Sequence, residues 1–357
     1  MVRRLRLATG LVLFAFVATH LANHSLGLVS LETMEAGRQW FLLLWRNPAA
    51  TTLLYGALFG HLALNLWSLS RRRTLRMPAW EAWQILLGLA VPVLLAEHLL
   101  GTRVLHEFYG VEDAYTYVIL VLWVFQPVAG LRQALLLFAV WTHGCLGLHY
   151  WLRLKPWYRR IAPYACATAL LVPTLALLGF ARAGRELALL ARDEAWLQAT
   201  AAALKFPDAE AVAFVGRGDL GVAVGFAALL ALIMAMRRAR LVWDRRRGTI
   251  YLTYPNGRRV AVVPGATILE TSRHAGIAHA SMCGGRARCS TCRVRINRGL
   301  ETLPPPSPHE THILKSVGAP ANVRLACQVR PTKDLEVTPL PPTATPCEAR
   351  ARSAPLG

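Results

Sequence analysis

The stretch that decides the fold of the C-terminal part of this chain is Cys283-Gly-Gly-Arg-Ala-Arg-Cys289-Ser-Thr-Cys292. Thirty-four further residues lead to Cys327, which lies in the run Arg-Leu-Ala-Cys-Gln. A tight loop can bring three thiolates to two irons while a distant strand end supplies the fourth, and the two glycines let backbone N–H groups approach the bridging sulfides. The pattern therefore predicts a 2Fe-2S cluster bound by these four cysteines.

Two other interpretations of the cysteines stay open. They could be four unrelated buried residues, although two glycines inside one cysteine loop argue against this. They could also bind a structural zinc ion, but such sites usually take cysteines as two C-x2–4-C pairs, whereas here three come from one loop and one stands alone. The cluster remains the interpretation that the spacing favours.

Short β-like runs surround the cysteine loop. Residues 250–253 (IYLT) and 259–263 (RVAVV) flank Pro-Asn-Gly, which predicts a hairpin, and 267–276 has helical spacing with a capping residue. Residues 292–296 alternate again, and 335–337 could close a sheet. The histidines of this region look like surface residues.

The loop CGGRARCSTC and the run RLACQ, placed after a hairpin and a helix, resemble the β-grasp 2Fe-2S ferredoxin fold over about 248–340. The resemblance implies an α+β domain in which Cys283, Cys289, Cys292 and Cys327 ligate the cluster. The first spacing departs from the C-x4-C of plant-type ferredoxins by one residue. It is closer to vertebrate-type ferredoxins and to the ferredoxin domains of some membrane reductases.

The rest of the chain has the composition of a membrane protein, since 54% of all residues are hydrophobic and the mean hydropathy is +0.35. Apolar runs long enough to cross a bilayer predict an α-helical bundle of six spans. A seventh run, 117–125, is too short to cross and we interpret it as interfacial. We see no internal repeat and no cleavable signal peptide. The six runs are 7–28, 51–69, 84–102, 132–152, 161–181 and 218–236.

The net charge of +20 is gathered in short basic clusters between the apolar runs, which argues against nucleic acid as a partner. With six spans, every basic cluster falls on one side, which the positive-inside rule makes cytoplasmic. The N-terminus and the region after residue 237 are therefore both predicted to be cytoplasmic. We divide the chain into a membrane anchor (1–247), a 2Fe-2S domain (248–340) and a disordered tail (341–357).

Histidines within the spans are functional candidates. At about 1.5 Å per residue, His20 and His98 each lie roughly 21 Å from the cytoplasmic edge, while His61 and His143 lie roughly 15 and 12 Å from it. Two level pairs predict two stacked b-type haems, with Gly60 and Gly144 leaving room for the porphyrins. The alternative is that each histidine merely forms a hydrogen bond between helices.

The runs TGLVLFAFVATHLANH, LFGHLALN, PVLLAEHLLGTR and VWTHGCLGLH resemble, over about 1–160, the dihaem cytochrome b anchor of succinate dehydrogenases and quinol:fumarate reductases. That resemblance implies haem ligation by His20, His61, His98 and His143, with His98 assigned least directly because ligand-bearing helices differ in the family. It also implies quinone or quinol as a partner.

An anchor of this kind fused to a ferredoxin domain resembles the N-terminal part of bacterial membrane-anchored class III adenylate cyclases. It implies a bacterial inner-membrane protein that senses or relays electrons. No cyclase sequence, acid–base pair or nucleophile occurs here, so we name no catalytic residue and leave open a truncated cyclase or a stand-alone module. The alternative function is a subunit that serves a separate flavoprotein in a quinone-linked oxidoreductase. A homodimer is also left open.

Overall fold

The computed structural model of the protein describes residues 2–72, 75, 77–246, 249–263 and 265–341, so the predicted tail lies outside the described residues from 342 onward. The chain divides into two compact units. The first comprises the residues up to Leu69 together with Pro78–Ile233, and the second comprises Ser70–Met77 and the residues from Met234. Arg240 and Arg237 donate to the carbonyls of Ser70 and Arg72, which explains why 70–77 groups with the second unit.

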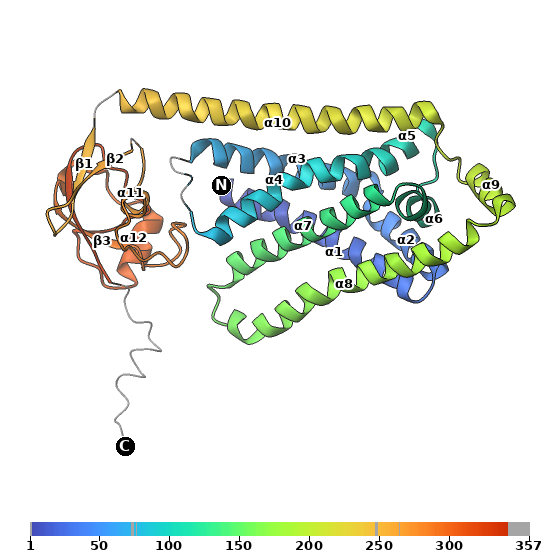
Figure 1. Ribbon diagram of the computed structural model, residues 1–357. Coiled ribbons are helices and arrows are strands. Elements are labelled where there is room, and N and C mark those ends of the chain that lie inside the picture. The colour runs from blue at the N-terminus through green and yellow to red at the C-terminus, as the bar shows by residue number, and fades with distance from the viewer. Residues whose placement is uncertain (1, 73–74, 76, 247–248, 264, 342–357) are drawn as a thin grey trace, which may run out of the picture. The chain divides into compact units, whose positions relative to one another are not determined.

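Six long apolar helices form most of the first unit and run side by side (Figure 1). Each is long and apolar enough to cross a membrane, and each of the six predicted runs overlaps one of them, which confirms the six long helices. Four runs fall inside their helices, while 7–28 and 84–102 continue three residues beyond the ends of α1 and α4. Most of these helices are longer than the predicted apolar runs, by several residues at one or both ends. The helices are α1 (Val2–Ser25), α3 (Pro48–Arg71), α4 (Ala79–Leu99), α7 (Pro127–Leu152), α8 (Tyr158–Leu190) and α10 (Ala209–Arg245).

Shorter helices, which the sequence did not lead us to predict, pack at one end of this bundle. Ser30 caps α2 by accepting from the backbone N–H of Thr33, and Asp193 caps α9 in the same way. The run 117–125 lies in short helical segments rather than in a helix of spanning length, as we expected, and its Ile119 and Leu120 are buried against Met34 and Leu187. These elements are η1 (Leu26–Leu28), α2 (Leu31–Trp45), the π-helix η2 (Leu100–Val104), α5 (Leu105–Tyr109), α6 (Tyr115–Ile119), the π-helix η3 (Leu120–Phe125) and α9 (Glu194–Ala203).

The second unit contains a five-stranded mixed sheet in the order β2-β1-β5-β3-β4. The predicted hairpin is confirmed, because β1 pairs with β2 antiparallel from Ile250↔Val262 to Thr253↔Arg259. β1 pairs with β5 in parallel, which joins the two ends of the domain. The elements are β1 (Ile250–Thr253), β2 (Arg259–Val262), α11 (Ile268–His274), β3 (Arg293–Arg298), η4 (Leu300–Thr302), α12 (Pro308–Lys315), β4 (Val323–Leu325) and β5 (Leu335–Pro339).

One hydrophobic core lies between the sheet and α11. Leu252, Ile268, Val294 and Val337 are fully buried in it, each from a different element. A capping box begins α11, since Thr267 accepts from the backbone N–H of Glu270 while the Glu270 carboxylate accepts from that of Thr267. This core fixes α11 on one side of the cysteine loop and β3 on the other.

Candidate cofactor sites

The four cysteines of the predicted cluster site are brought together as two pairs. Cys283 and Cys289 lie in the loop between α11 and β3, and their thiols form a hydrogen bond. Cys292 ends the same loop, and its Sγ lies 3.4 Å from the Sγ of Cys327, which follows β4. Three of the side chains are buried and Cys289 is half-buried.

Backbone N–H groups of the loop point at the sulfurs. Gly284, Gly285 and Ala287 have φ angles of 68°, 82° and 50°, and this left-handed run turns the chain inward. The hydrogen bond with Cys289, with those from the N–H groups of Arg288 and Arg286, lowers the pKa of Cys283 to about 5 although burial opposes the shift. The loop is therefore built to hold negative charge on sulfur.

The second pair behaves in the same way. Hydrogen bonds from Cys292, from the Gln328 amide and from the N–H of Ala287 lower the pKa of Cys327, against the effect of burial. One thiol of each pair is thus prepared to lose its proton.

The division into pairs bears on the choice between iron and zinc. Each iron of a 2Fe-2S cluster takes two thiolates, so its ligands divide two and two, whereas zinc needs all four around one point. The division of the cysteines into the pairs Cys283–Cys289 and Cys292–Cys327 matches the two-and-two ligand set of a two-iron cluster.

Known proteins match the region around these cysteines. Residues 253–332 match the family model described as a 2Fe-2S iron-sulfur cluster binding domain. The 2Fe-2S ferredoxin of Escherichia coli K12 is 32% identical over 88 residues, which cover 24% of this chain and 79% of that protein. This chain belongs to the 2Fe-2S ferredoxin family. The match supports both the cluster and an electron-transfer role for the ferredoxin domain.

Two further comparisons also fall on a limited part of the chain. A subunit of the Na(+)-translocating NADH-quinone reductase of Marinomonas sp. is 30% identical over 120 residues, which cover 33% of this chain but only 28% of that protein. The ISC-like [2Fe-2S] ferredoxin from Pseudomonas putida, known from a crystal structure, is 32% identical in sequence to the matched part of this chain. The match covers 25% of this chain and 90% of that ferredoxin, with a TM-score of 0.24.

Helix α12 supports the ferredoxin site in a way that the sequence did not lead us to expect. Glu310 is buried and accepts two bonds of 2.9 and 3.0 Å from Arg324, as well as one from the N–H of Leu325, two residues before Cys327. His309 is exposed, as we expected, yet its Nε2 donates to the carbonyl of Ala287 in the cysteine loop at 2.7 Å. Ser-Pro-His-Glu at 307–310 is a helix-start signal that could have revealed α12.

The four candidate haem ligands meet in the two predicted pairs. The ring centroids of His20 and His98 lie 6.2 Å apart, and those of His61 and His143 also lie 6.2 Å apart. A metal held between two imidazoles on opposite sides, with metal–nitrogen bonds of about 2.0 Å, places the ring centroids roughly 6.3 Å apart. Each pair would therefore have room for one metal ion between its two imidazoles.

Hydrogen bonds orient the rings of the second pair. His143 Nδ1 lies 2.9 Å from the carbonyl of Gln84, and His61 Nδ1 lies 3.2 Å from the carbonyl of Arg6. Since a carbonyl can only accept, Nδ1 of His143 carries the proton and its Nε2 keeps a lone pair for a metal. His61 Nδ1 also lies 3.2 Å from the hydroxyl of Thr9, which can either donate to it or accept from it. His20 Nδ1 in the other pair is buried and has no hydrogen-bond partner among the described residues.

Two glycines that we did not select from the sequence lie against these rings. A Cβ on Gly88 would be 2.7 Å from His143 Cε1, and a Cβ on Gly10 would be 3.1 Å from His61 Cε1. The glycines that we predicted to make room for porphyrin lie elsewhere. Gly60 approaches only Thr9 within the part of the chain that the structure describes, and Gly144 packs on the ring of Phe14.

The two pairs repeat one arrangement. On α1, the carbonyl of Arg6 and the backbone of Gly10 lie against His61, and ten residues after Gly10 comes His20, which belongs to the other pair. On α4, the carbonyl of Gln84 and the backbone of Gly88 lie against His143, and ten residues after Gly88 comes His98. The intervals of four and ten residues are identical. Each of the two helices therefore carries a ligand of one pair and lies against a ring of the other.

The ten-residue interval gives a larger separation between the two histidine pairs along the bundle than the separation that we predicted from the sequence. Ten residues of α-helix rise about 15 Å, so His20 and His98 lie about that far along the bundle from His61 and His143. Depths counted from the ends of the apolar runs gave a separation of only about 6–9 Å. The difference arises because α1 begins at Val2, before the start of the apolar run from which the depth of His20 was counted. We call His61–His143 the basic-end pair, since it lies towards Arg6, and His20–His98 the far-end pair.

Aromatic rings and a third histidine surround the far-end pair. Phe16 and Phe41 pack on His20 with centroids at 5.9 and 5.3 Å, so α2 covers this pair. The ring of His24 lies 4.6 Å from that of His20 and 5.3 Å from that of Tyr115. His149, which we did not assign as a ligand, instead contacts the hydroxyl of Tyr158 at 3.0 Å.

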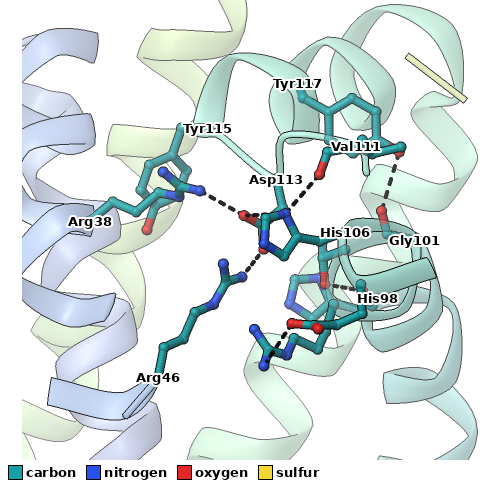
Figure 2. A network of polar contacts seen from close by, with 12 residues as sticks. Arg38, Arg46, His98, Gly101, His106, Val111, Asp113, Tyr115 and Tyr117 are labelled. Atoms are coloured by element: carbon teal, nitrogen blue, oxygen red, sulfur yellow. Dashed lines mark hydrogen bonds and ion pairs between the residues drawn. The ribbon is translucent and has the colours of Figure 1, made fainter. Parts of the chain in front are cut away.

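A charged network lies at the same end of the bundle, in the short segments outside the long helices. Asp113 is buried, and it accepts from Arg38 at 2.6 Å and from Arg46 (Figure 2). His106 Nδ1 lies 4.0 Å from the same carboxylate and donates to the carbonyl of Val111 (Figure 2). The network ties the end of α2 to the loop before α6.

Proposed function

We propose that this protein is a membrane-bound module that transfers electrons, or senses redox state, between haem b in the bilayer and a 2Fe-2S cluster in the ferredoxin domain. The cluster would be ligated by Cys283, Cys289, Cys292 and Cys327, and two haems by His20, His61, His98 and His143. When bound, these groups supply one-electron chemistry. The chain's own residues supply the ligands, the N–H donors and the spacing.

The observation that carries the proposal is the geometry of the two histidine pairs. Each pair joins two different helices of the first unit, and both have the same centroid distance of 6.2 Å. Histidines that only link helices through hydrogen bonds have no reason to meet as two equal pairs. The contact of His143 adds to this, since a proton on Nδ1 leaves its Nε2 free for a metal.

The proposed setting is the bacterial inner membrane, with the N-terminus and the ferredoxin domain in the cytoplasm. Six apolar helices of spanning length and the basic clusters on one predicted side support this topology. A quinol is the proposed electron donor, because of the resemblance to dihaem cytochrome b anchors. An adenylate cyclase output is proposed on resemblance alone, and a homodimer stays equally open.

The alternative function is a subunit of a quinone-linked oxidoreductase that serves a separate flavoprotein. The similarity to an NADH-quinone reductase subunit favours it, although the chain spans only 28% of that protein. The two functions differ in turnover. Membranes that hold the full chain and catalyse rapid quinol-dependent reduction of a soluble flavoprotein would favour the oxidoreductase, and slow single-turnover oxidation would favour the sensor.

Visible spectra of the purified full chain, with counts of iron, sulfide and haem, test the proposal. We expect two haems and one 2Fe-2S cluster per chain, with an α-band in the b-type region after dithionite. The variants H61A and H98A should each remove one haem and leave the cluster. Protein without an α-band would end the haem assignment while leaving the ferredoxin domain as it is.

A further inference from the structure

The part of the ferredoxin domain around the cysteine loop carries a surplus of positive charge. Residues 249–340 contain twelve Lys and Arg but only five Asp and Glu. No carboxylate occurs between 271 and 300, a stretch that contains three of the four cluster cysteines and six arginines. Formal charges give a 2Fe-2S cluster on four thiolates two negative charges when oxidised and three when reduced. The cluster would therefore offset less than half of the surplus.

The five carboxylates of this region do little to compensate the cysteine loop. Three of them form ion pairs with arginines inside the domain: Glu310–Arg324, Asp334–Arg259 and Glu336–Arg298. A fourth, Glu270, is held in the capping box of α11, and the fifth, Glu301, lies in η4 beyond the end of β3. Since β3 starts beside Cys292 and rises about 3.4 Å per residue, its end at Arg298 lies roughly 20 Å from that cysteine.

Several arginines near the cysteines have neutral partners and so keep their charge. Each of three donates to a hydroxyl or a carbonyl: Arg273 to Ser281, Arg293 to Pro341 and Arg330 to Gly265. The backbone N–H groups of Arg286 and Arg288 reach the sulfur of Cys283, so both side chains leave the chain at the loop itself. Arg295 is exposed on β3 and has no hydrogen-bond or ion-pair partner within the described residues.

The same surface gives access to the cluster site. Cys289 is half-buried, and Met282, next to Cys283, is 57% exposed. No other large hydrophobic side chain is exposed in residues 249–263 and 265–341. Met and Arg are both enriched in protein–protein interfaces, whereas a surface that enters the membrane interface presents a broad apolar face. These observations favour a protein as the partner of this surface.

The basic segments beside the apolar runs do not supply a matching negative surface. Segments 1–6, 70–83, 152–161 and 237–247 contain seventeen Lys and Arg but only two carboxylates, Glu81 and Asp244. The negative charge that would match the cysteine loop therefore has to come from another molecule.

We infer that the cysteine loop, with Arg286, Arg288 and Arg295, binds an electron-transfer protein whose surface around its own cofactor is acidic. The inference rests on the electron-transfer part of the proposed function. One electron passes from the reduced cluster to an oxidised one-electron cofactor of the partner, with no bond made and no proton moved. Opposite charges speed the encounter and orient the two cofactors towards each other. The competing explanation is that the arginines lie against anionic lipid headgroups.

The test offers the full chain one probe protein in two charge states. Native cytochrome c is basic, and succinylation of its lysines makes it acidic while its haem stays in place. The purified chain is reduced with dithionite, separated from the reductant and mixed with each ferric form, while visible circular dichroism follows oxidation of the cluster. At low ionic strength the succinylated form should oxidise the cluster roughly 10- to 100-fold faster than the native form. The ratio should fall towards one at about 1 M salt, where the Debye length is about 3 Å.

Variants locate the surface on the domain. R286E/R288E reverses two charges in the cysteine loop and should bring the ratio of the two rates close to one. R295Q should lower the ratio about twofold for each partner charge that lies about 10 Å away. R298Q is its matched control, because it removes one charge from the far end of the same strand, where Arg298 already pairs with Glu336, and it should keep the wild-type ratio. Iron counts and the circular dichroism of each variant show that the cluster is retained.

Equal rates for the two forms of cytochrome c in the wild type would overturn the inference, as would an unchanged ratio in both R286E/R288E and R295Q. Nanodiscs test the lipid explanation. A difference between wild type and R286E/R288E that is present in phosphatidylcholine but disappears in phosphatidylglycerol would assign the arginines to headgroups and also overturn the inference. Dithionite reduces the cluster without the haems, so protein that lacks an α-band would count against the haem part of the proposed function and leave this test intact.

Discussion

A methyl group on Gly88 is the sharpest test of the histidine geometry. The ring of His143 rests on the bare backbone of Gly88, and a Cβ there would lie 2.7 Å from Cε1 and 3.0 Å from Nδ1. His143 would have to move, which would strain its hydrogen bond with the carbonyl of Gln84 and turn Nε2 away from His61. G88A should therefore weaken binding of the basic-end haem specifically.

The size of the effect follows from the overlap. Inserting a methyl group into a well-packed site typically costs about 1–3 kcal/mol. At about 1.4 kcal/mol per tenfold change, haem binding at the basic-end pair should weaken roughly 5- to 150-fold. G10A should have a smaller effect, because its Cβ would lie 3.1 Å from His61 Cε1. Since alanine favours helix over glycine by up to about 1 kcal/mol, any loss cannot be attributed to helix propensity.

G60A is the matched control. Gly60 is next to His61 on α3, but among the described residues its Cβ would meet only Thr9 Cγ2, at 3.8 Å, which is ordinary contact. Haem content per chain and the midpoints of the α-band would be measured in the three variants under increasing competition from a haem-binding protein. We expect haem loss in the order G88A, G10A, G60A. Full retention in G88A, or equal loss in G60A, would refute this reasoning.

Three other changes test separate parts of the chain. C327S should abolish the cluster signals in iron and sulfide counts and leave the α-band intact, and loss of both would contradict two independent cofactor sites. E310Q leaves Arg324 buried without its full counter-charge, so cluster bleaching in denaturant should show a loss of about 3–5 kcal/mol in the ferredoxin domain. D219N removes a bidentate partner of Arg132 and should cost about 2 kcal/mol, measured as earlier thermal release of haem; an unchanged release temperature would show that α10 is held otherwise.

The ferredoxin domain was largely predictable because its signals are local. The cysteine loop, the Pro-Asn-Gly turn and the capping box at Thr267 each specify a conformation within a few residues. The bounds of strand β4, whose end we expected near Cys327, and the existence of helix α12 were not predicted, for different reasons. β4 has only three residues, too few for a period, while the start signal of α12 was present but overlooked.

The histidine pairs were predicted from depth, yet their surroundings were not. Depth uses only the rise of a helix, whereas the direction of each ring depends on rotation about the helix axis and on the partner helix. Hydropathy therefore paired His20 with His98 correctly but did not reveal Gly10 or Gly88. The charged network around Asp113 joins residues 75 positions apart, and nothing in the local sequence marks such a contact.

The equal intervals on α1 and α4 mean that each helix must keep a fixed register between the glycine under one histidine ring and the histidine of the other pair. Insertions are therefore far more harmful than substitutions within these helices. One extra residue between Gly10 and His20 would turn His20 by about 100° around the helix, whereas α4 would keep its own register. In alignments of relatives, the ten-residue interval should thus stay free of gaps even where the residues inside it vary.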